Sequence, residues 1–85
     1  MLSKEEQKIA MEILRNANVA LVSSYEPKSK RIKATVLYDD KTDTVVPTKH
    51  ALAALVGTCS QYLGLSNEQL LEELEDILSE DENHD

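Results

Sequence analysis

The sequence is poor in cysteine, glycine and large aromatic residues, and each shortage excludes a class of protein. A single cysteine, Cys59, cannot form a disulfide within the chain. The two glycines, Gly57 and Gly64, are too few for a glycine-rich phosphate-binding loop. With three Tyr, no Phe and no Trp, the core is expected to be aliphatic. A disulfide-stapled scaffold and a P-loop nucleotide-binding protein are therefore excluded.

Positive charge is also scarce, and this bears on the partners of the protein. Nine Lys and Arg stand against 16 Asp and Glu, which gives a net charge of −7. That balance disfavours bulk attraction to nucleic acid or to an anionic membrane. The chain has no apolar run of membrane-spanning length, and its first ten residues lack the apolar stretch of a signal peptide. We therefore expect a cytoplasmic protein with no membrane partner.

The length of the chain bounds the number of domains. A chain of 85 residues is expected to form one domain and to bury about 60–65% of the surface that it exposes when unfolded. We expect that domain to cover residues 1–80, with 81–85 as a flexible acidic tail. Because a small aliphatic core often gains stability by pairing with a second copy, a homodimer is one candidate state.

The first half of the chain predicts one helix and two strands. The stretch 3–6, with Ser3 and Glu6 at its ends, fits a capping box that begins a helix. A β-type run follows at 19–25, and after a loop at 26–30 the residues 31–38 alternate between apolar and polar. In this second run Ile32, Ala34, Val36 and Tyr38 point one way and Arg31, Lys33 and Thr35 the other. That alternation is typical of a half-buried strand.

A third short strand and a second helix are predicted next. The residues 44–46 are β-type, and Pro47 is expected to end them because proline lacks the amide that a strand ladder needs. Thr48 is the expected N-cap of a helix from 50 to 63, and Gly64 its C-terminal stop. Gly57 in the middle of this helix suggests close packing against another element.

The last predicted element is an acidic helix. A second capping box, Ser66 to Gln69, opens it. Its apolar residues fall at helical spacing, which gives a stripe that can face a core: Leu70, Leu71, Leu74, Ile77 and Leu78. The sequence thus predicts an α+β fold of order α-β-β-β-α-α, a three-stranded antiparallel β-meander with an N-terminal helix and two C-terminal helices.

The acids of this last helix are the first candidate functional site. From Asn67 to the end the sequence holds nine acidic residues and no Lys or Arg. Acids near the C-terminus of a helix oppose its dipole, and so do like charges four residues apart, so stability alone does not explain them. They either keep the surface soluble or face a basic partner, and the partner-binding candidates are Glu72, Glu73, Glu75, Asp76 and Glu80.

A basic hairpin is the second candidate. Four of the nine basic residues, Lys28, Lys30, Arg31 and Lys33, lie within six positions. At the end of a β-ribbon they could contact phosphates, with Tyr25 stacking on a base if it faces outward. Alternatively, they only guard a loop and an edge strand against aggregation, or they meet the acidic helix of a second copy.

Metal and catalytic sites are not expected. Asp39, Lys41 and Asp43 are spaced like the start of a calcium loop. Such a loop needs Gly at its sixth position and Glu at its twelfth, where this chain has Thr44 and His50. The two histidines lack neighbouring ligands, and Cys59 reads as a buried small hydrophobe without a base. We therefore expect no cofactor and no enzymatic activity.

These observations favour a small acidic, non-enzymatic protein-interaction module that offers its acidic helix to a basic protein partner. Its general type is that of accessory proteins and inhibitors encoded by phages or mobile elements. The alternatives are a nucleic-acid-binding protein that uses the hairpin at 28–33 and a structural subunit of a homo-oligomer. Nucleic acid ranks below a protein partner because of the net charge.

Overall fold

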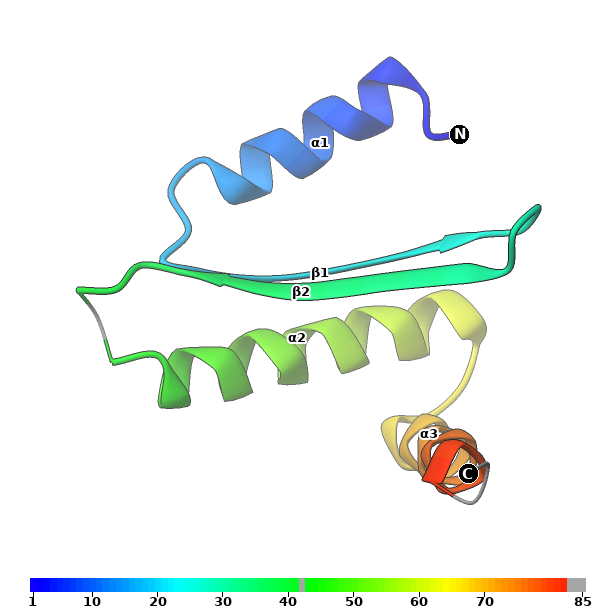
Figure 1. Cartoon of the computed structure of the whole chain (residues 1–85). Helices are drawn as coiled ribbons and strands as arrows, with labels where there is room; N and C mark the ends of the chain where they lie inside the picture. Colours follow the sequence, from blue (N-terminus) through cyan, green and yellow to red (C-terminus); the bar gives the residue numbers. More distant parts are fainter. Residues whose placement is uncertain (42, 83–85) are drawn as a thin grey trace. The chain divides into compact units, whose positions relative to one another are not determined.

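The structure, a computed structural model, describes residues 1–41 and 43–82, and Figure 1 shows its elements. The order is helix, strand, strand, helix, helix, with these bounds: α1 Lys4–Leu14, β1 Val19–Glu26, β2 Arg31–Tyr38, α2 Val45–Leu63 and α3 Asn67–Glu82. The chain divides into two compact units, Met1–Ala51 and Leu52–Asp85. This is a small α+β fold. The part of the expected tail at 83–85 lies outside the described residues.

Helix α1 begins as the sequence predicts. The Ser3 hydroxyl accepts a hydrogen bond from the Glu6 amide at 3.1 Å, and the Glu6 carboxylate accepts one from the Ser3 amide at 3.0 Å. This reciprocal pair satisfies two amides that a helix start would otherwise leave without partners. The capping box is therefore confirmed. The helix ends at Leu14 with Arg15 as its C-cap.

The two strands form an antiparallel hairpin in regular register, from Val19 opposite Tyr38 to Glu26 opposite Arg31. A four-residue turn, 27–30, joins them. Lys30 closes this turn in the left-handed region, at φ 54°. Side chains directly opposite each other in an antiparallel pair lie on the same face of the sheet. The register therefore fixes which side chains share a face.

The predicted three-stranded meander is wrong, because the sheet of the described residues has two strands. The expected third strand at 44–46 begins helix α2 instead. The carbonyl of Thr44 accepts from the Thr48 amide at 2.9 Å, and the Asp43 carboxylate accepts from the Val45 amide at 3.1 Å. The first amides of a helix have no intrahelical partner, so Pro47 removes no bond in this first turn.

The same shift corrects the expected start of the second helix. Thr48 is not an N-cap but the fourth residue of α2, and His50 lies a further two residues inside. Between β2 and α2, the Asp39 carboxylate accepts a hydrogen bond from the Lys41 amide at 3.0 Å.

The link from α2 to α3 follows the sequence closely. Gly64 adopts φ +70°, its amide donates to the Gln61 carbonyl at 3.3 Å, and the Leu65 amide donates to the Ser60 carbonyl at 3.0 Å. These two bonds are those of a Schellman stop. The second capping box is also confirmed, with Ser66 and Gln69 exchanging bonds of 2.9 and 3.1 Å.

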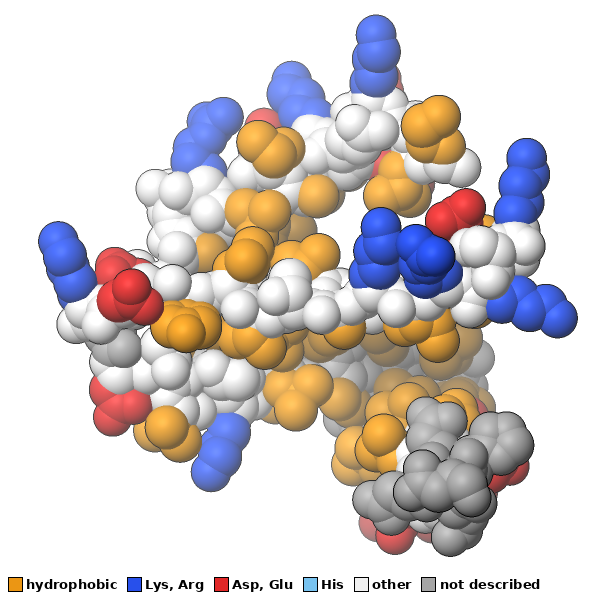
Figure 2. All heavy atoms as spheres, viewed as in Figure 1, with side chains coloured by type: hydrophobic (Ala, Val, Ile, Leu, Met, Phe, Trp, Pro, Cys, Tyr) orange, Lys and Arg blue, Asp and Glu red, His pale blue; other side chains and the backbone are white. Residues whose placement is uncertain are grey.

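The described residues bury few side chains, unlike the aliphatic core that the composition predicts. Leu70, 6% exposed, is the buried hydrophobic residue among them, and Ser60 the buried polar one. The Ser60 hydroxyl donates to the Val56 carbonyl at 2.8 Å, so its burial leaves no polar group unpaired. The expectation that β2 is half-buried is wrong, since all eight of its residues are exposed. Figure 2 shows hydrophobic side chains, in orange, open to the surface along α1 and the hairpin.

Candidate functional site

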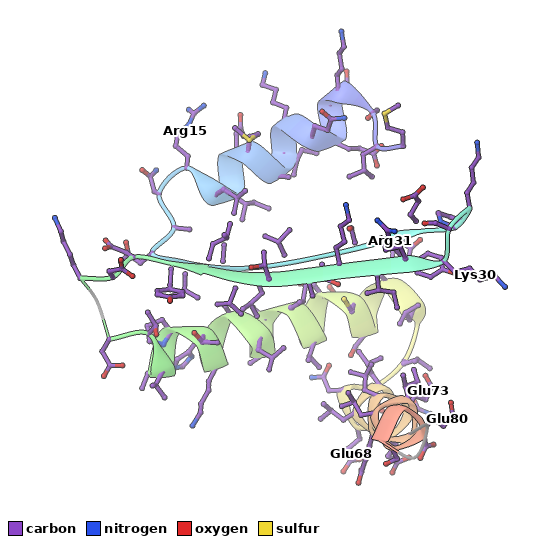
Figure 3. All side chains as sticks on the ribbon, in the orientation of Figure 1. Arg15, Lys30, Arg31, Glu68, Glu73 and Glu80 are labelled. Carbon is purple, nitrogen blue, oxygen red and sulfur yellow. The ribbon has the colours of Figure 1, made fainter. Side chains whose placement is uncertain are left out.

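Helix α3 carries the predicted partner-binding acids on one side. At 100° per residue, Glu72, Glu73, Glu75, Asp76 and Glu80 fall within an arc of about 160°. We call these five residues the acidic face. All five are exposed. Figure 3 shows Glu73 and Glu80 pointing to the same side of α3, and Glu68 to another. The last turn of α3 has no basic residue, so its C-terminal acids lack the compensation that the helix dipole favours.

The other side of α3 is apolar. Leu70, Leu71, Leu74, Ile77 and Leu78, which we call the leucine stripe, span about 120° of the helix. Leu70 is 6% exposed, but Leu71 is 52%, Leu74 38%, Ile77 54% and Leu78 63% exposed. Carboxylates flank the stripe on both edges, with Glu73 beside Ile77 and Glu75 beside Leu71 by helical spacing. From the sequence this stripe was expected to face a core, and its exposure was not predicted.

Four of the nine basic residues lie at or next to the turn of the hairpin, and Figure 2 shows blue side chains there as well as along α1. We call Lys28, Lys30, Arg31 and Lys33 the basic tip. All four are exposed, and Figure 3 marks Lys30 and Arg31 at the end of the hairpin. Arg31 lies directly opposite Glu26, and Lys33 opposite Ser24. The structure therefore brings the four predicted basic residues together, next to one acid.

The register separates Tyr25 from these cations. Tyr25 lies opposite Ile32, whereas Arg31 and Lys33 occupy the alternate positions and so lie on the other face of the hairpin. Tyr25 is 61% exposed. A strand of nucleic acid that contacts Arg31 and Lys33 through its phosphates would not reach the Tyr25 ring from the same side. The expected combination of stacking and phosphate contact is not assembled on one face.

The hairpin has one apolar face and one mixed face. The apolar face consists of Val19, Leu21, Ser23, Tyr25, Ile32, Ala34, Val36 and Tyr38. The mixed face carries the remaining residues of both strands. It is apolar near α1 and charged toward the turn. A hollow of about 260 Å³ lies at its apolar end, lined by Leu14, Ala17, Asn18, Ala20, Leu37, Tyr38 and Asp39.

The titratable groups of the described residues give one clear electrostatic effect. The hydrogen bond that the Ser3 amide donates to the Glu6 carboxylate, together with the neighbouring Ser3 hydroxyl, lowers the pKa of the Glu6 carboxyl below its ordinary value of 4.5. Both groups favour the charged carboxylate, which the capping box needs. Among the side chains that the structure describes, in residues 1–41 and 43–80, no three His, Cys, Asp or Glu come together as a metal site requires. Cys59 is free and partly exposed, so the expectation that it is buried is wrong.

Comparison with protein-family models, with curated proteins and with solved structures finds no significant match to this chain. In the part of the chain that the structure describes, no helix combines the length and the apolar character needed to cross a membrane. The surfaces on α3 and on the hairpin are therefore interpreted from their own chemistry.

Proposed function

We propose that the protein is a non-enzymatic interaction module that binds a protein partner through α3. The leucine stripe enters an apolar groove of the partner, and the carboxylates along its edges meet Lys and Arg side chains at the rim of that groove. The observation that carries this proposal is the exposure of Leu71, Leu74, Ile77 and Leu78, at 38 to 63%. An amphipathic helix that lays its apolar side into a groove is a recurring mode of protein recognition.

The apolar contacts supply affinity. Burying a Leu or Ile side chain completely contributes about 1.5–3 kcal/mol, so the half that is still exposed contributes roughly 1 kcal/mol for each side chain. The four exposed residues of the leucine stripe together contribute roughly 4 kcal/mol before the cost of association. This free energy alone is too small for a specific complex, which also requires a well-fitting groove and additional polar contacts.

The acidic face supplies orientation and speed. Opposite charges across an interface steer the encounter and reject partners of the wrong sign more than they add affinity. With no Lys or Arg after Asn67, α3 presents an unmixed negative field. We therefore expect association with the partner to slow as salt is added.

The experiment compares two single substitutions on opposite sides of α3. Ile77→Asp places a charge in the leucine stripe, and Ser79→Asp places the same charge among the acids. The partner is first recovered from cells with the wild-type chain, and its affinity is then measured by calorimetry. We expect Ile77→Asp to weaken binding at least about tenfold, the equivalent of 1.4 kcal/mol, and Ser79→Asp to leave it unchanged.

Charge reversal tests the acidic face. The triple change Glu72→Lys, Glu75→Lys and Asp76→Lys should slow association and weaken its salt dependence. The matched change of Lys30, Arg31 and Lys33 to Glu should have neither effect. If the partner binds both α3 variants as it binds the wild type, the proposal is wrong.

A second candidate is binding of nucleic acid by the basic tip, favoured by its four exposed cations at one end of the hairpin. Tyr25 on the opposite face and the net charge of −7 count against it. Under this candidate, reversing Lys30, Arg31 and Lys33 to Glu abolishes the binding of single-stranded DNA or RNA in a filter assay. The α3 triple variant then binds at least as well as the wild type.

A further inference from the structure

The outer edge of β1 is an unpaired strand edge. Among the described residues the sheet has two strands, so β1 pairs with β2 on one side and with no strand on the other. A two-stranded hairpin is marginally stable in water, and three or more strands are needed for independent stability. The edge of β1 is thus a place where an additional strand would stabilise the fold.

The direction of the hydrogen bonds shows which residues present this edge. The Asp39 amide donates to the Asn18 carbonyl at 2.9 Å, so the backbone groups of Asn18 point toward the second strand. In an antiparallel ladder successive residues point their backbone groups to alternate sides. The register is regular from Val19 to Glu26. The amides and carbonyls of Val19, Leu21, Ser23 and Tyr25 therefore point outward.

The two strands of the hairpin differ in the charged residues that they carry. From Val19 to Tyr25, β1 has seven residues with no charge and no proline. Strand β2 carries Arg31 and Lys33, and charged residues, Lys especially, are a common means of keeping edge strands from pairing. The edge of β1 has no such protection. This difference indicates that β1 is the edge that pairs.

We propose that β1 pairs antiparallel with β1 of a second copy of this chain, giving a continuous four-stranded sheet, β2-β1-β1-β2. The two-fold axis passes beside Val22. Val19 then lies opposite Tyr25 of the partner, and Leu21 opposite Ser23 of the partner. This register engages all four outward-pointing residues of each copy and forms about eight backbone hydrogen bonds.

A second copy fits this edge better than an unrelated strand because the segment is self-complementary. An isologous contact needs the same surface to match itself after a half turn. Here no charge lies opposite a like charge, since the paired segment has none. The antiparallel arrangement also sets the two basic tips toward opposite ends of the sheet. Along the strands, at 3.4 Å per residue, the two Arg31 positions lie roughly 27 Å apart and the two Lys33 positions roughly 14 Å apart. Both distances exceed the screening length of about 8 Å at physiological salt.

The proposed register also brings together the apolar faces of the two hairpins. They lie on the same side of the four-stranded sheet, because opposed residues share a face. Tyr25 is 61% exposed and Ile32 69% exposed on each. The combined face is an apolar layer twice as wide as that of one hairpin. The dimer therefore has a larger continuous apolar face than one copy has.

Disulfide crosslinking tests the proposed axis. Val22 and Thr35 form one rung of the hairpin and so provide a matched pair on opposite edges. In a Cys59→Ser background, Val22→Cys places two thiols beside the axis. Their Cα atoms lie about 4.5 Å apart, within the range that a disulfide spans. Under mild oxidation we expect most of the Val22→Cys protein to migrate as a dimer on a non-reducing gel, and Thr35→Cys to remain monomeric.

Proline substitution tests the hydrogen bonds. Ser23→Pro removes an outward amide and leaves the ladder between β1 and β2 intact. Ser24→Pro removes an amide that points to β2 and so should disrupt the hairpin. By sedimentation equilibrium the wild type is expected at twice 9.5 kDa and Ser23→Pro at 9.5 kDa, with the strand signal in circular dichroism retained.

Two outcomes of the crosslinking experiment overturn the proposal. If Thr35→Cys crosslinks and Val22→Cys does not, β2 is the pairing edge. If neither crosslinks and the wild type sediments at 9.5 kDa, the edge of β1 is left for a different protein or for none. Should Ser23→Pro fail to fold, the crosslinking pair still decides the question. None of these outcomes bears on the binding of a partner by α3, which uses different residues.

Discussion

Replacing each of the two glycines of the second unit by Ala is expected to change the stability of the fold in opposite directions. Gly57 lies in the interior of α2, and a Cβ built there meets no atom within 4 Å. Gly64 follows the end of α2 at φ +70°. Gly57→Ala should stabilise the fold, because Ala favours a helix interior over Gly by about 1 kcal/mol. Gly64→Ala should destabilise it by about 1–2 kcal/mol, because a Cβ is strained in the left-handed region.

Thermal unfolding followed by circular dichroism at 222 nm measures both changes at one protein concentration. In a domain of this size 1 kcal/mol corresponds to a shift of about 4–8 °C in Tm. We expect Gly57→Ala to raise Tm by about that amount, and Gly64→Ala to lower it by at least as much. The urea midpoint should move in the same directions.

Because the two substitutions are expected to shift Tm in opposite directions, the sign of each shift is decisive. The sequence alone suggested that Gly57 packs closely against another element, and in that case Ala would clash and lower Tm. A fall in Tm for Gly57→Ala would therefore support that prediction and contradict the open surroundings in the structure. An unchanged Tm for Gly64→Ala would show that α2 does not end in the left-handed conformation in solution.

Two further predictions concern the start of α1 and the turn of the hairpin. Because Ser3 lowers the pKa of Glu6, the stabilisation from this carboxylate is fully present above pH 4.5 and is lost as the pH falls through the lowered pKa. In Ser3→Ala, which removes the hydroxyl and keeps the backbone amide, a carbon-detected NMR titration should show the Glu6 pKa rising part of the way toward 4.5, and no rise would rule out the Ser3 hydroxyl as a cause. Lys30 holds φ 54°, so Lys30→Gly should stabilise the hairpin by about 0.5–1 kcal/mol in urea unfolding. Lys28→Gly is the control, and an equal gain there would contradict the role of backbone strain.

Local signals were predictable from the sequence because they depend on neighbouring residues. The capping boxes at Ser3 and Ser66 and the glycine stop at Gly64 all form as predicted, with side chain and backbone partners at most five residues apart. The hairpin also follows, since the alternation in 31–38 fixes which residues share a face. These features need only the preferences of short segments.

The third strand failed as a prediction because the segment is too short to decide its own structure. Val45 and Val46 favour a strand by intrinsic preference, and Pro47 is compatible with the end of a strand or with the first turn of a helix. The cap from Asp43 and the long helical run after Pro47 outweigh two β-branched residues. A two-residue preference is weak against a helix of 19 residues that hydrogen bonds continue.

The candidate sites also have features that the sequence predicts and features that depend on contacts between distant residues. The position of the charge follows from the sequence alone: an acidic last helix, a basic hairpin turn and an uncharged run at 19–25. The exposure of the side chains depends on the tertiary structure, because burial requires contacts between residues far apart in the chain. In the structure the leucine stripe is a surface and not part of a core, strand register separates Tyr25 from the basic tip, and the outer edge of β1 has no strand partner among the described residues.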